Sequence, residues 1–310
     1  MRVAVVGING RLGSALAEAL ENAPFTGTRG PIGWDQPELD LDTLTESAAG
    51  AFLDTERPEV VIHTAAWTDV DGCAREPELA LLRNGTAVGE LARACARRGI
   101  DMLFISTNEV FDGRRTDGIG YAPGDARNPI NPYAAAKAEG ELLVIAAFEA
   151  DGARGRLGIV RTSWLYGPPG GDFPAKIAAA AIRARDAGTP LRLVADEVGV
   201  PTYTPDLAEA IVELIAEDAI TAALGRWAVH HLVNSGRASR ADWAREVLRA
   251  TRIDVPVVDV PGSTWERLST APAWAVLAPT ALPSGEPMRD WRDAMADYAP
   301  VLLRAVERPA

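Results

Sequence analysis

Apolar positions in the first half of the chain follow two alternating periods. Short runs rich in Val, Ile and Phe predict strands, and stretches rich in Ala, Leu and Glu predict helices. Strands and helices follow one another in turn, which is typical of a parallel sheet with helices on both faces. The predicted strands cover residues 2–6, 30–34, 60–63, 102–106 and 157–161, and the predicted helices cover residues 11–22, 41–55, 77–98 and 133–148.

The pattern changes after Gly167, where the loop GPPGGD interrupts it. Helices are predicted at residues 173–187, 204–216 and 288–298, with short strands at 191–195 and 228–233. We therefore expect an α/β protein with a large lobe over residues 1–166, to which segments near 190–235 contribute, and a smaller lobe over residues 167–310.

Composition narrows the function classes. The net charge of -12 argues against a nucleic-acid partner or an anionic membrane surface, since both need clustered basic residues. The sequence has no apolar run of membrane-spanning length and no signal-peptide pattern at its start, so we expect a cytoplasmic protein. Two cysteines, Cys73 and Cys95, and three histidines, His63, His230 and His231, suggest neither a disulfide framework nor a metal site.

The segment VAVVGINGRLG lies between the first predicted strand and the first predicted helix, with glycines at Gly7, Gly10 and Gly13. Glycines there allow a sharp turn and let a pyrophosphate approach the helix N-terminus. The GxxGxxG spacing is one residue wider at its first step than the common dehydrogenase pattern. A plain glycine-rich turn is the alternative, but the strand–turn–helix setting favours a Rossmann-type, doubly wound nucleotide-binding sheet.

Asp35 follows the second predicted strand. A carboxylate at this point can accept hydrogen bonds from the adenosine ribose and favours NAD, although a solvated turn is an equal alternative. Arg11 or Arg29 could instead meet a 2′-phosphate, so the cofactor, NADPH or NADH, stays open. The third strand ends in His63 and the small residues Thr64-Ala65-Ala66, which permit a ligand to approach closely.

Tyr133 and Lys137 lie four residues apart on a predicted helix and therefore share a face. An ammonium near a phenol lowers the phenol pKa, so Tyr133 could act as a general acid near neutral pH. Thr107 ends the fourth strand, where its hydroxyl could hold a substrate oxygen. A Tyr-Lys pair alone is weak, but together with the glycine motif it predicts a reductase site.

These motifs together resemble the extended short-chain dehydrogenase/reductases, and most closely the dTDP-4-dehydrorhamnose reductase family. The resemblance spans residues 7 to about 203. It rests on the blocks GINGRLG, RPEVVIHTAAWTDVD, NGTAVGELARAC, FISTNEVFDG, NPINPYAAAKAEGE, RTSWLYG and VADEVGVPTY.

The resemblance implies roles for residues at the matching positions. Tyr133 would donate the proton, Lys137 would bind the nicotinamide ribose, and Thr107 would orient the substrate oxygen. Trp164, Asn108 and Glu109 would face the sugar together with Thr107. The implied cofactor-binding set is Gly7, Asn9, Gly10, Arg11, Leu12, Asp35, Asp40, Leu41, Ala65, Ala66, Trp67, Tyr133 and Lys137.

The chain departs from the family pattern around the substrate. Asn108 and Glu109 stand where the family usually has Asp and Tyr, and Glu197 replaces a Gln. The segments 71–74 and 271–277 also differ. Two purely structural roles stay open as alternatives to sugar binding. Trp164 could be an aromatic residue of the core or lobe interface, and Glu109 could be a solvated cap at the strand end.

The implied activity is NAD(P)H-dependent reduction of the C4 ketone of a dTDP-4-keto-6-deoxyhexose, with dTDP-4-dehydrorhamnose as the first choice. The expected partner is thus a dTDP-linked sugar, and a homodimer is left open. Two alternatives remain: a nucleotide-sugar epimerase or dehydratase on the same scaffold, and a non-catalytic NADP-binding regulatory subunit.

Overall fold

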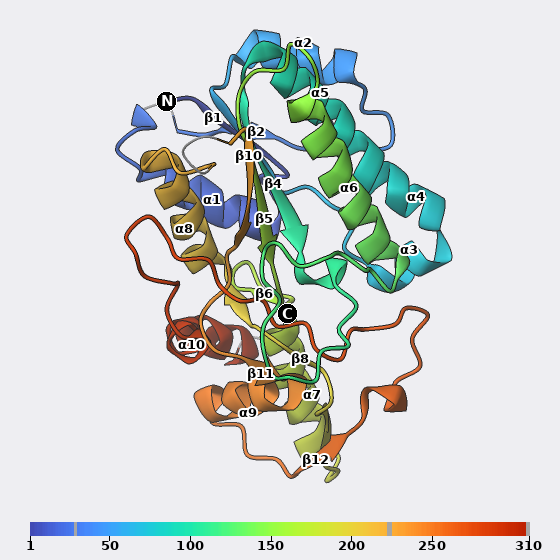
Figure 1. Ribbon diagram of the computed structural model, residues 1–310. Helices are drawn as coiled ribbons and strands as arrows, with labels where there is room; N and C mark the ends of the chain where they lie inside the picture. The colour runs from blue at the N-terminus through green and yellow to red at the C-terminus, as the bar shows by residue number, and fades with distance from the viewer. Residues whose placement is uncertain (28–29, 222–224, 308–310) are drawn as a thin grey trace.

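A six-stranded, fully parallel sheet forms the centre of the larger lobe in the computed structural model (Figure 1). The structure describes the chain except residues 28–29, 222–224 and 308–310, so Arg29 lies outside the described residues. In spatial order the strands are β2 (Ile32–Trp34), β1 (Val3–Val6), β3 (Val60–His63), β4 (Asp101–Thr107), β5 (Leu157–Thr162) and β10 (Trp227–His231).

The strand order reverses direction between β1 and β3. The chain leaves β1 for β2 on one side and then returns to β3 on the other. Such a switch point opens a crevice at the carboxyl ends of the strands, where α/β sheets bind their ligands. The predicted α/β, doubly wound fold is confirmed.

Helices cover both faces of this sheet because its strands are apolar on both sides. In β1, Val3 and Val5 pack into one core and Ala4 and Val6 into the other. One face carries α1 (Arg11–Glu21) and α8 (Thr204–Ala216), and the opposite face carries α2 (Glu46–Glu56), α5 (Ala87–Arg98) and α6 (Pro132–Glu149) (Figure 1).

The smaller lobe lies beyond the carboxyl ends of the strands, around an aromatic core that includes Tyr166, Trp243 and Tyr298 (Figure 1). We propose it as the second unit of the chain. Its helices are α7 (Phe173–Asp186), α9 (Arg240–Thr251) and α10 (Trp291–Glu307), with the short turn η4 (Gly262–Thr264). Its strands pair as β6 (Leu165–Tyr166) with β9 (Thr202–Tyr203), β7 (Leu191–Val194) with β12 (Val257–Val260), and β8 (Val198–Gly199) with β11 (Ala238–Ser239).

The structure differs from the sequence prediction in the segment 77–98, which was predicted as one helix. It contains α4 (Pro77–Leu81), a π-helical turn η2 (Leu82–Thr86) and α5, and the short helix α3 (Val70–Arg75) precedes it. The prediction also missed α9 and β12, and α2 begins five residues later than predicted. In the described part of the chain, no helix combines the length and apolar character needed to cross a membrane.

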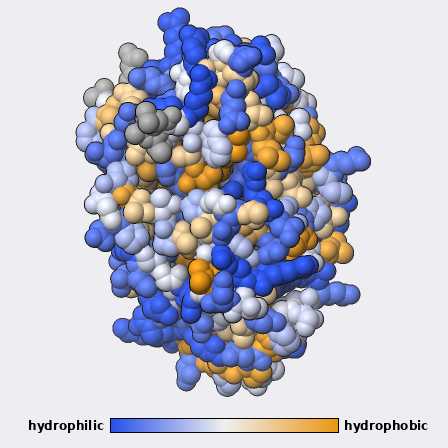
Figure 2. Space-filling view, in the orientation of Figure 1, coloured by the Kyte–Doolittle hydropathy of each residue, from blue (hydrophilic) through white to orange (hydrophobic). Residues whose placement is uncertain are grey.

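The surface is largely hydrophilic, with hydrophobic residues gathered over α5 and α6 on the face seen in Figure 2. Leu142 of α6 is 48% exposed, whereas Leu103 of β4 is completely buried between the sheet and its helices.

We expect Leu103→Ala to lower the free energy of unfolding by about 3 kcal/mol, because it leaves a cavity in the central strand. Leu142→Ala is the matched control and should change stability by less than about 0.5 kcal/mol. Urea denaturation followed by circular dichroism measures both. Equal effects of the two substitutions would contradict the placement of the core.

Candidate functional site

A cavity of about 630 Å³ opens at the switch point, between the strand ends of the larger lobe and the start of the smaller one. Most of the residues singled out in the sequence meet there. Its lining includes Gly7, Gly10, Arg11, Leu12, Asp35, Leu41, Ala65, Ala66, Thr107, Asn108, Glu109, Tyr133, Lys137 and Trp164.

The glycine loop shapes the floor of this cavity. Gly7 has a φ of +83°, which favours glycine, and a Cβ there would lie 2.7 Å from the backbone nitrogen of Ala65. A Cβ at Gly13 would collide with the carbonyl oxygen of Gly7. No side chain caps the N-terminus of α1 at Gly10, and its first turn carries no acidic residue. These residues therefore fit the diphosphate of a dinucleotide at a helix N-terminus.

Asp35 and Arg11 flank the glycine loop with different partners. The Asp35 carboxylate accepts hydrogen bonds from the backbone N–H groups of Asn9 and Gln36, each at 2.9 Å. Arg11 donates to the carbonyls of Gly167 and Gly170 in the smaller lobe at 2.5 and 2.7 Å. Asp35 thus presents negative charge to the cavity, while the Arg11 side chain ties the glycine loop to the smaller lobe.

The π-helical turn η2 places Asn84 beneath the loop that follows β3. The fully buried Asn84 accepts from the N–H of Trp67 at 2.8 Å and donates to the carbonyl of the same residue at 2.9 Å. It therefore fixes the backbone next to Ala65 and Ala66. The sequence analysis missed Asn84, although an Asn-Gly pair inside a helical pattern is a signal of such an irregularity.

Helix α6 carries Tyr133 and Lys137 into the cavity. Asn131 caps its N-terminus by accepting from the N–H of Ala134 at 2.8 Å. Lys137 is 2% exposed and donates to the carbonyl of Ile105 in β4 at 2.7 Å. The last residue of β4 is Thr107, whose side chain lies beside that of Tyr133 at the cavity. The structure thus brings together the three residues proposed for catalysis.

Desolvation shifts the pKa values of both groups on α6. It raises the pKa of Tyr133 above its usual value; the nearby Glu109 raises this pKa further, and the polar side chain of Thr107 opposes both. Burial lowers the pKa of Lys137 to about 7. The expectation that Lys137 lowers the Tyr133 pKa is therefore wrong for this structure, because burial and a neighbouring carboxylate act in the opposite direction. A raised pKa keeps Tyr133 protonated, as a proton donor requires.

Glu109 is not a solvated cap. Its carboxylate accepts from the Asn131 side chain at 2.8 Å and lines two adjoining cavities. Desolvation raises its pKa, opposed chiefly by the hydrogen bond from Asn131. Asn108 is 3% exposed and donates to the carbonyl of Ala275 at 2.9 Å, so it anchors the segment 271–277.

Trp164 lines the cavity and is also an aromatic residue of the core, as one of the two sequence alternatives expected. Its ring lines the cavity and also packs in the core of the smaller lobe, stacked near Trp243 with the Arg240 guanidinium 3.7 Å from its centroid. The backbone of Trp164 has a φ of +45°, which is uncommon outside glycine. Its ring lies so close to Gly199 that a Cβ there would be 2.6 Å away.

The second cavity, of about 1190 Å³, continues from the first into the smaller lobe. Glu109 and Arg240 line both. Glu197 lies at the junction and forms ion pairs with Arg267 at 2.6 Å and Arg240 at 3.7 Å. Five further basic and acidic residues of this cavity are Lys176, Arg183, Arg192, Asp69 and Asp71.

Lys176 is a residue that the sequence analysis missed. The chain has 31 basic Lys and Arg residues, of which only Lys137 and Lys176 are lysines. Both lie in the connected cavities, one in each. Lysine carries a compact charge on a flexible side chain, and arginine cannot replace it at every site. In a chain with so few lysines, the position of Lys176 could therefore have marked it as a candidate site residue.

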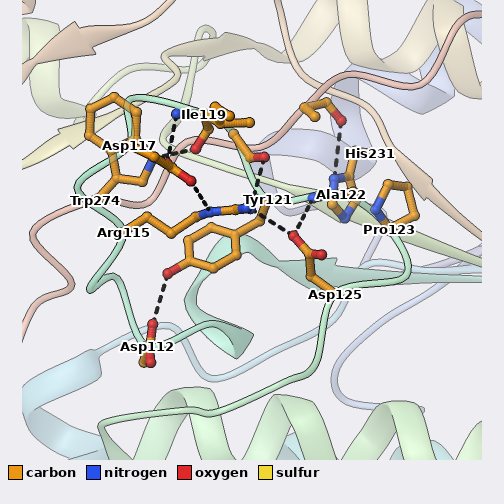
Figure 3. A network of polar contacts seen from close by, with 12 residues as sticks. Asp112, Arg115, Asp117, Ile119, Tyr121, Ala122, Pro123, Asp125, His231 and Trp274 are labelled. Carbon is orange, nitrogen blue, oxygen red and sulfur yellow. Dashed lines mark hydrogen bonds and ion pairs between the residues drawn. The ribbon is translucent and has the colours of Figure 1, made fainter.

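A polar network holds the loop between Phe111 and Asn128 over the strand ends (Figure 3). Arg115 binds Asp125 at 2.8 Å, and the Tyr121 hydroxyl donates to Asp112 at 2.8 Å. The indole of Trp274 donates to the carbonyl of Ile119 at 2.8 Å, which fastens the segment 271–277 to the same loop. The unusual segment 271–277 is therefore part of the wall around Asn108.

Three predicted cofactor residues lie off the cavity lining. Asn9 and Asp40 are exposed, and Asn9 takes part through its backbone bond to Asp35. Trp67 packs against Cys73 and lies near Arg83, whose guanidinium is 5.1 Å from the ring centroid.

The doubly wound sheet, the glycine loop and the Thr-Tyr-Lys arrangement define a short-chain dehydrogenase/reductase that uses a nicotinamide cofactor. The sequence model of the RmlD substrate binding domain family matches residues 1–303. The chain therefore belongs to this family, the dTDP-4-dehydrorhamnose reductase family. The predicted family, NAD(P)H-dependent nucleotide-sugar ketoreductase class and cofactor type are confirmed.

Curated relatives and solved structures agree with this assignment. The dTDP-4-dehydrorhamnose reductase of Mycobacterium tuberculosis is 34% identical over 99% of this chain and 96% of its own. The structure of the Clostridium acetobutylicum dTDP-4-dehydrorhamnose reductase has a TM-score of 0.84 and 31% identity over 97% of this chain and 99% of its own. That of the Bacillus anthracis enzyme in complex with NADP has a TM-score of 0.80 and 29% identity over 96% and 98%.

We expect Lys137→Met to stabilise the protein while abolishing activity. Below pH 7 the folded protein holds Lys137 charged in a buried site, whereas the unfolded chain holds it charged in water. Above pH about 7 the folded protein loses the Lys137 proton, whereas the unfolded chain keeps it up to the higher pKa of an ordinary lysine. The free energy of unfolding of the wild type therefore rises with pH above about 7. The variant should therefore gain roughly 2 kcal/mol near pH 6.5, and this gain should shrink toward pH 9. Urea denaturation of both proteins at several pH values measures the difference, and a gain independent of pH would contradict the argument.

Proposed function

We propose that this enzyme reduces the C4 ketone of a dTDP-4-keto-6-deoxyhexose, with dTDP-4-dehydrorhamnose as the preferred substrate. The observation that carries the proposal is the placement of Thr107, Tyr133 and Lys137 at the cofactor cavity, with Glu109 joining it to a second, larger cavity. The names of the similar proteins, a dTDP-4-keto-6-deoxy-D-glucose reductase and a dTDP-4-dehydrorhamnose reductase, support the same substrate class.

The residues divide the work of the reaction. The nicotinamide, when bound, supplies the hydride. Thr107 holds the ketone oxygen, and Tyr133, kept protonated by its raised pKa, donates a proton to that oxygen. Lys137 holds the nicotinamide ribose, and the cleft between the lobes limits the access of water.

The second cavity suits a nucleotide-linked sugar. Lys176, Arg183 and Arg192 supply positive charge for the diphosphate of the nucleotide. The hexose would then lie at the junction, near Glu109 and Trp164, where the two cavities meet. The chemistry of the lining therefore matches both ends of the proposed substrate.

Oxidation of the reduced cofactor tests the proposal. The purified enzyme is mixed with NADH or NADPH and with dTDP-4-dehydrorhamnose or a related dTDP-4-keto-6-deoxyhexose, and absorbance at the reduced-nicotinamide band is followed. Stoichiometric oxidation with formation of the 4-hydroxy sugar is expected. Conversion of the sugar without net oxidation would instead indicate an epimerase or dehydratase. A stoichiometric protein partner without turnover would indicate a regulatory subunit.

We expect Tyr133→Phe to lower kcat by about 100-fold or more while leaving cofactor binding intact, because it removes the proton donor alone. Fluorescence titration with the reduced cofactor measures binding. Tyr203→Phe, in the core of the smaller lobe, is the control and should keep kcat within about twofold. Undiminished kcat in Tyr133→Phe would refute the role given to Tyr133.

We further propose that Asp35 favours NADH, because its carboxylate would face the 2′-phosphate of NADPH. In Asp35→Asn, kcat/KM for NADPH relative to NADH should rise about tenfold or more, since a like-charge repulsion is removed. Glu38→Gln is the control, because Glu38 is exposed and lies off the cavity lining. An unchanged ratio in Asp35→Asn would show that Asp35 does not select the cofactor.

A further inference from the structure

A buried charge network lies directly behind the catalytic residues. Glu141 is completely buried one helical turn after Lys137. Its carboxylate accepts from the Ser106 hydroxyl at 2.6 Å, from Arg161 at 2.7 and 2.9 Å, and from Arg127 at 3.1 Å. Such a carboxylate with four donors is a fixed part of the structure.

The network joins the segments that carry the reaction. Ser106 precedes Thr107 in β4, and Arg161 is the register partner of Ser106 in β5. Arg161 in turn pairs in register with His231 of β10 and donates to the carbonyl of Pro123 in the loop of Figure 3. Glu141 thus links three strand ends and the loop that covers them.

Side chains of helix α6 contact three successive residues at the end of β4. Tyr133 meets Thr107, Lys137 meets the carbonyl of Ile105, and Glu141 meets Ser106. The spacing of four residues along the helix brings all three side chains to one face. A shift of α6 along the strand would therefore break all three contacts together.

We propose that Glu141 is a positioning residue of this active site: it clamps Ser106 and Arg161 and supports the positive charge of Lys137. The role in catalysis rests on the proposed function, whereas the effect on Lys137 does not. Glu141 itself touches neither the cofactor cavity nor the second cavity.

Of the groups around Lys137, Glu141 is the one whose negative charge favours the ammonium, and its carboxylate is itself ion-paired with Arg161 and Arg127. Tyr133 and Glu141 come from α6, and β4 contributes the carbonyl of Ile105 and the ring of Phe104, 4.2 Å from the ammonium. His63 of β3 is completely buried, and burial lowers its pKa to about 3, so it is neutral in the range of an assay. Burial lowers the pKa of Lys137, and Glu141 is the group that opposes this shift.

The scarcity of lysine allows a direct test. Carbon-13 labelling of lysine Cε gives two signals, one from the buried Lys137 and one from the exposed Lys176. In Glu141→Gln the pKa of Lys137 should fall below its wild-type value while that of Lys176 stays unchanged. Glu139→Gln, on the same helix but outside the network, is the matched control and should leave both titrations unchanged.

The pH dependence of kcat provides a second test of the role of Glu141. In Glu141→Gln, kcat should fall about tenfold and the alkaline limb of its pH profile should move to lower pH, because activity needs the charged Lys137. Glu141→Asp keeps the carboxylate and should return the alkaline limb toward the wild-type position. A folded Glu141→Gln with a wild-type Lys137 titration would overturn the proposal.

Ser106→Ala tests the same contact if Glu141→Gln does not fold. It removes the hydrogen bond between β4 and Glu141 but no charge, so it should lower kcat several-fold with an unchanged KM for the cofactor and an unchanged Lys137 titration. A wild-type kcat in Ser106→Ala would overturn the clamp. If the wild-type enzyme reduces no dTDP-keto sugar, the lysine titration still decides the effect of Glu141, so the two proposals fail separately.

Discussion

The hydrogen bond from the buried ammonium of Lys137 to the carbonyl of Ile105 joins helix α6 to the end of β4. The carbonyl lies two residues before Thr107, and the ammonium lies one turn after Tyr133, so this contact fixes the distance between the two residues proposed to face the substrate oxygen. Helix α6 is long and packs along the sheet, which makes it a rigid support. The relative position of these residues therefore follows from the packing of α6 against β4.

That arrangement places charged side chains in the protein interior, away from water. Lys137, Glu141 and Arg161 are each at most 3% exposed. Buried ion pairs seldom add stability over apolar side chains of similar size, but removal of Glu141 would leave the buried guanidinium of Arg161 without its ion-pair partner. The network is therefore best understood as a device for specificity of position. This network lowers the stability of the centre of the molecule, while the apolar cores on the two faces of the sheet stabilise it.

The parts that sequence predicted well are those with local causes. The strand–glycine loop–helix unit, the Tyr133–Lys137 spacing and the end of β4 at Thr107 each depend on a few neighbouring residues. Sequence could not show the direction of the Tyr133 pKa shift, because that depends first on the burial of the phenol and then on the proximity of Glu109 from another element. The bond of Asn84 to Trp67 was hidden for the same reason, as it joins residues 17 positions apart.

The departures from the family pattern converge on the substrate side of this rigid frame. Glu109 and Glu197 face Arg240 and Arg267 where the two cavities meet, so carboxylates and guanidiniums stand side by side there. Paired charges of this kind offer hydrogen-bond donors and acceptors to neutral hydroxyl groups without a strong net field. Further into the second cavity, Lys176, Arg183 and Arg192 are an excess of cations that suits a diphosphate. On the proposed function, the basic wall secures the nucleotide half that all such substrates share, and the paired junction distinguishes one hexose from another. Replacement of Glu109 or Glu197 would then change which sugar is reduced more than how tightly the nucleotide binds.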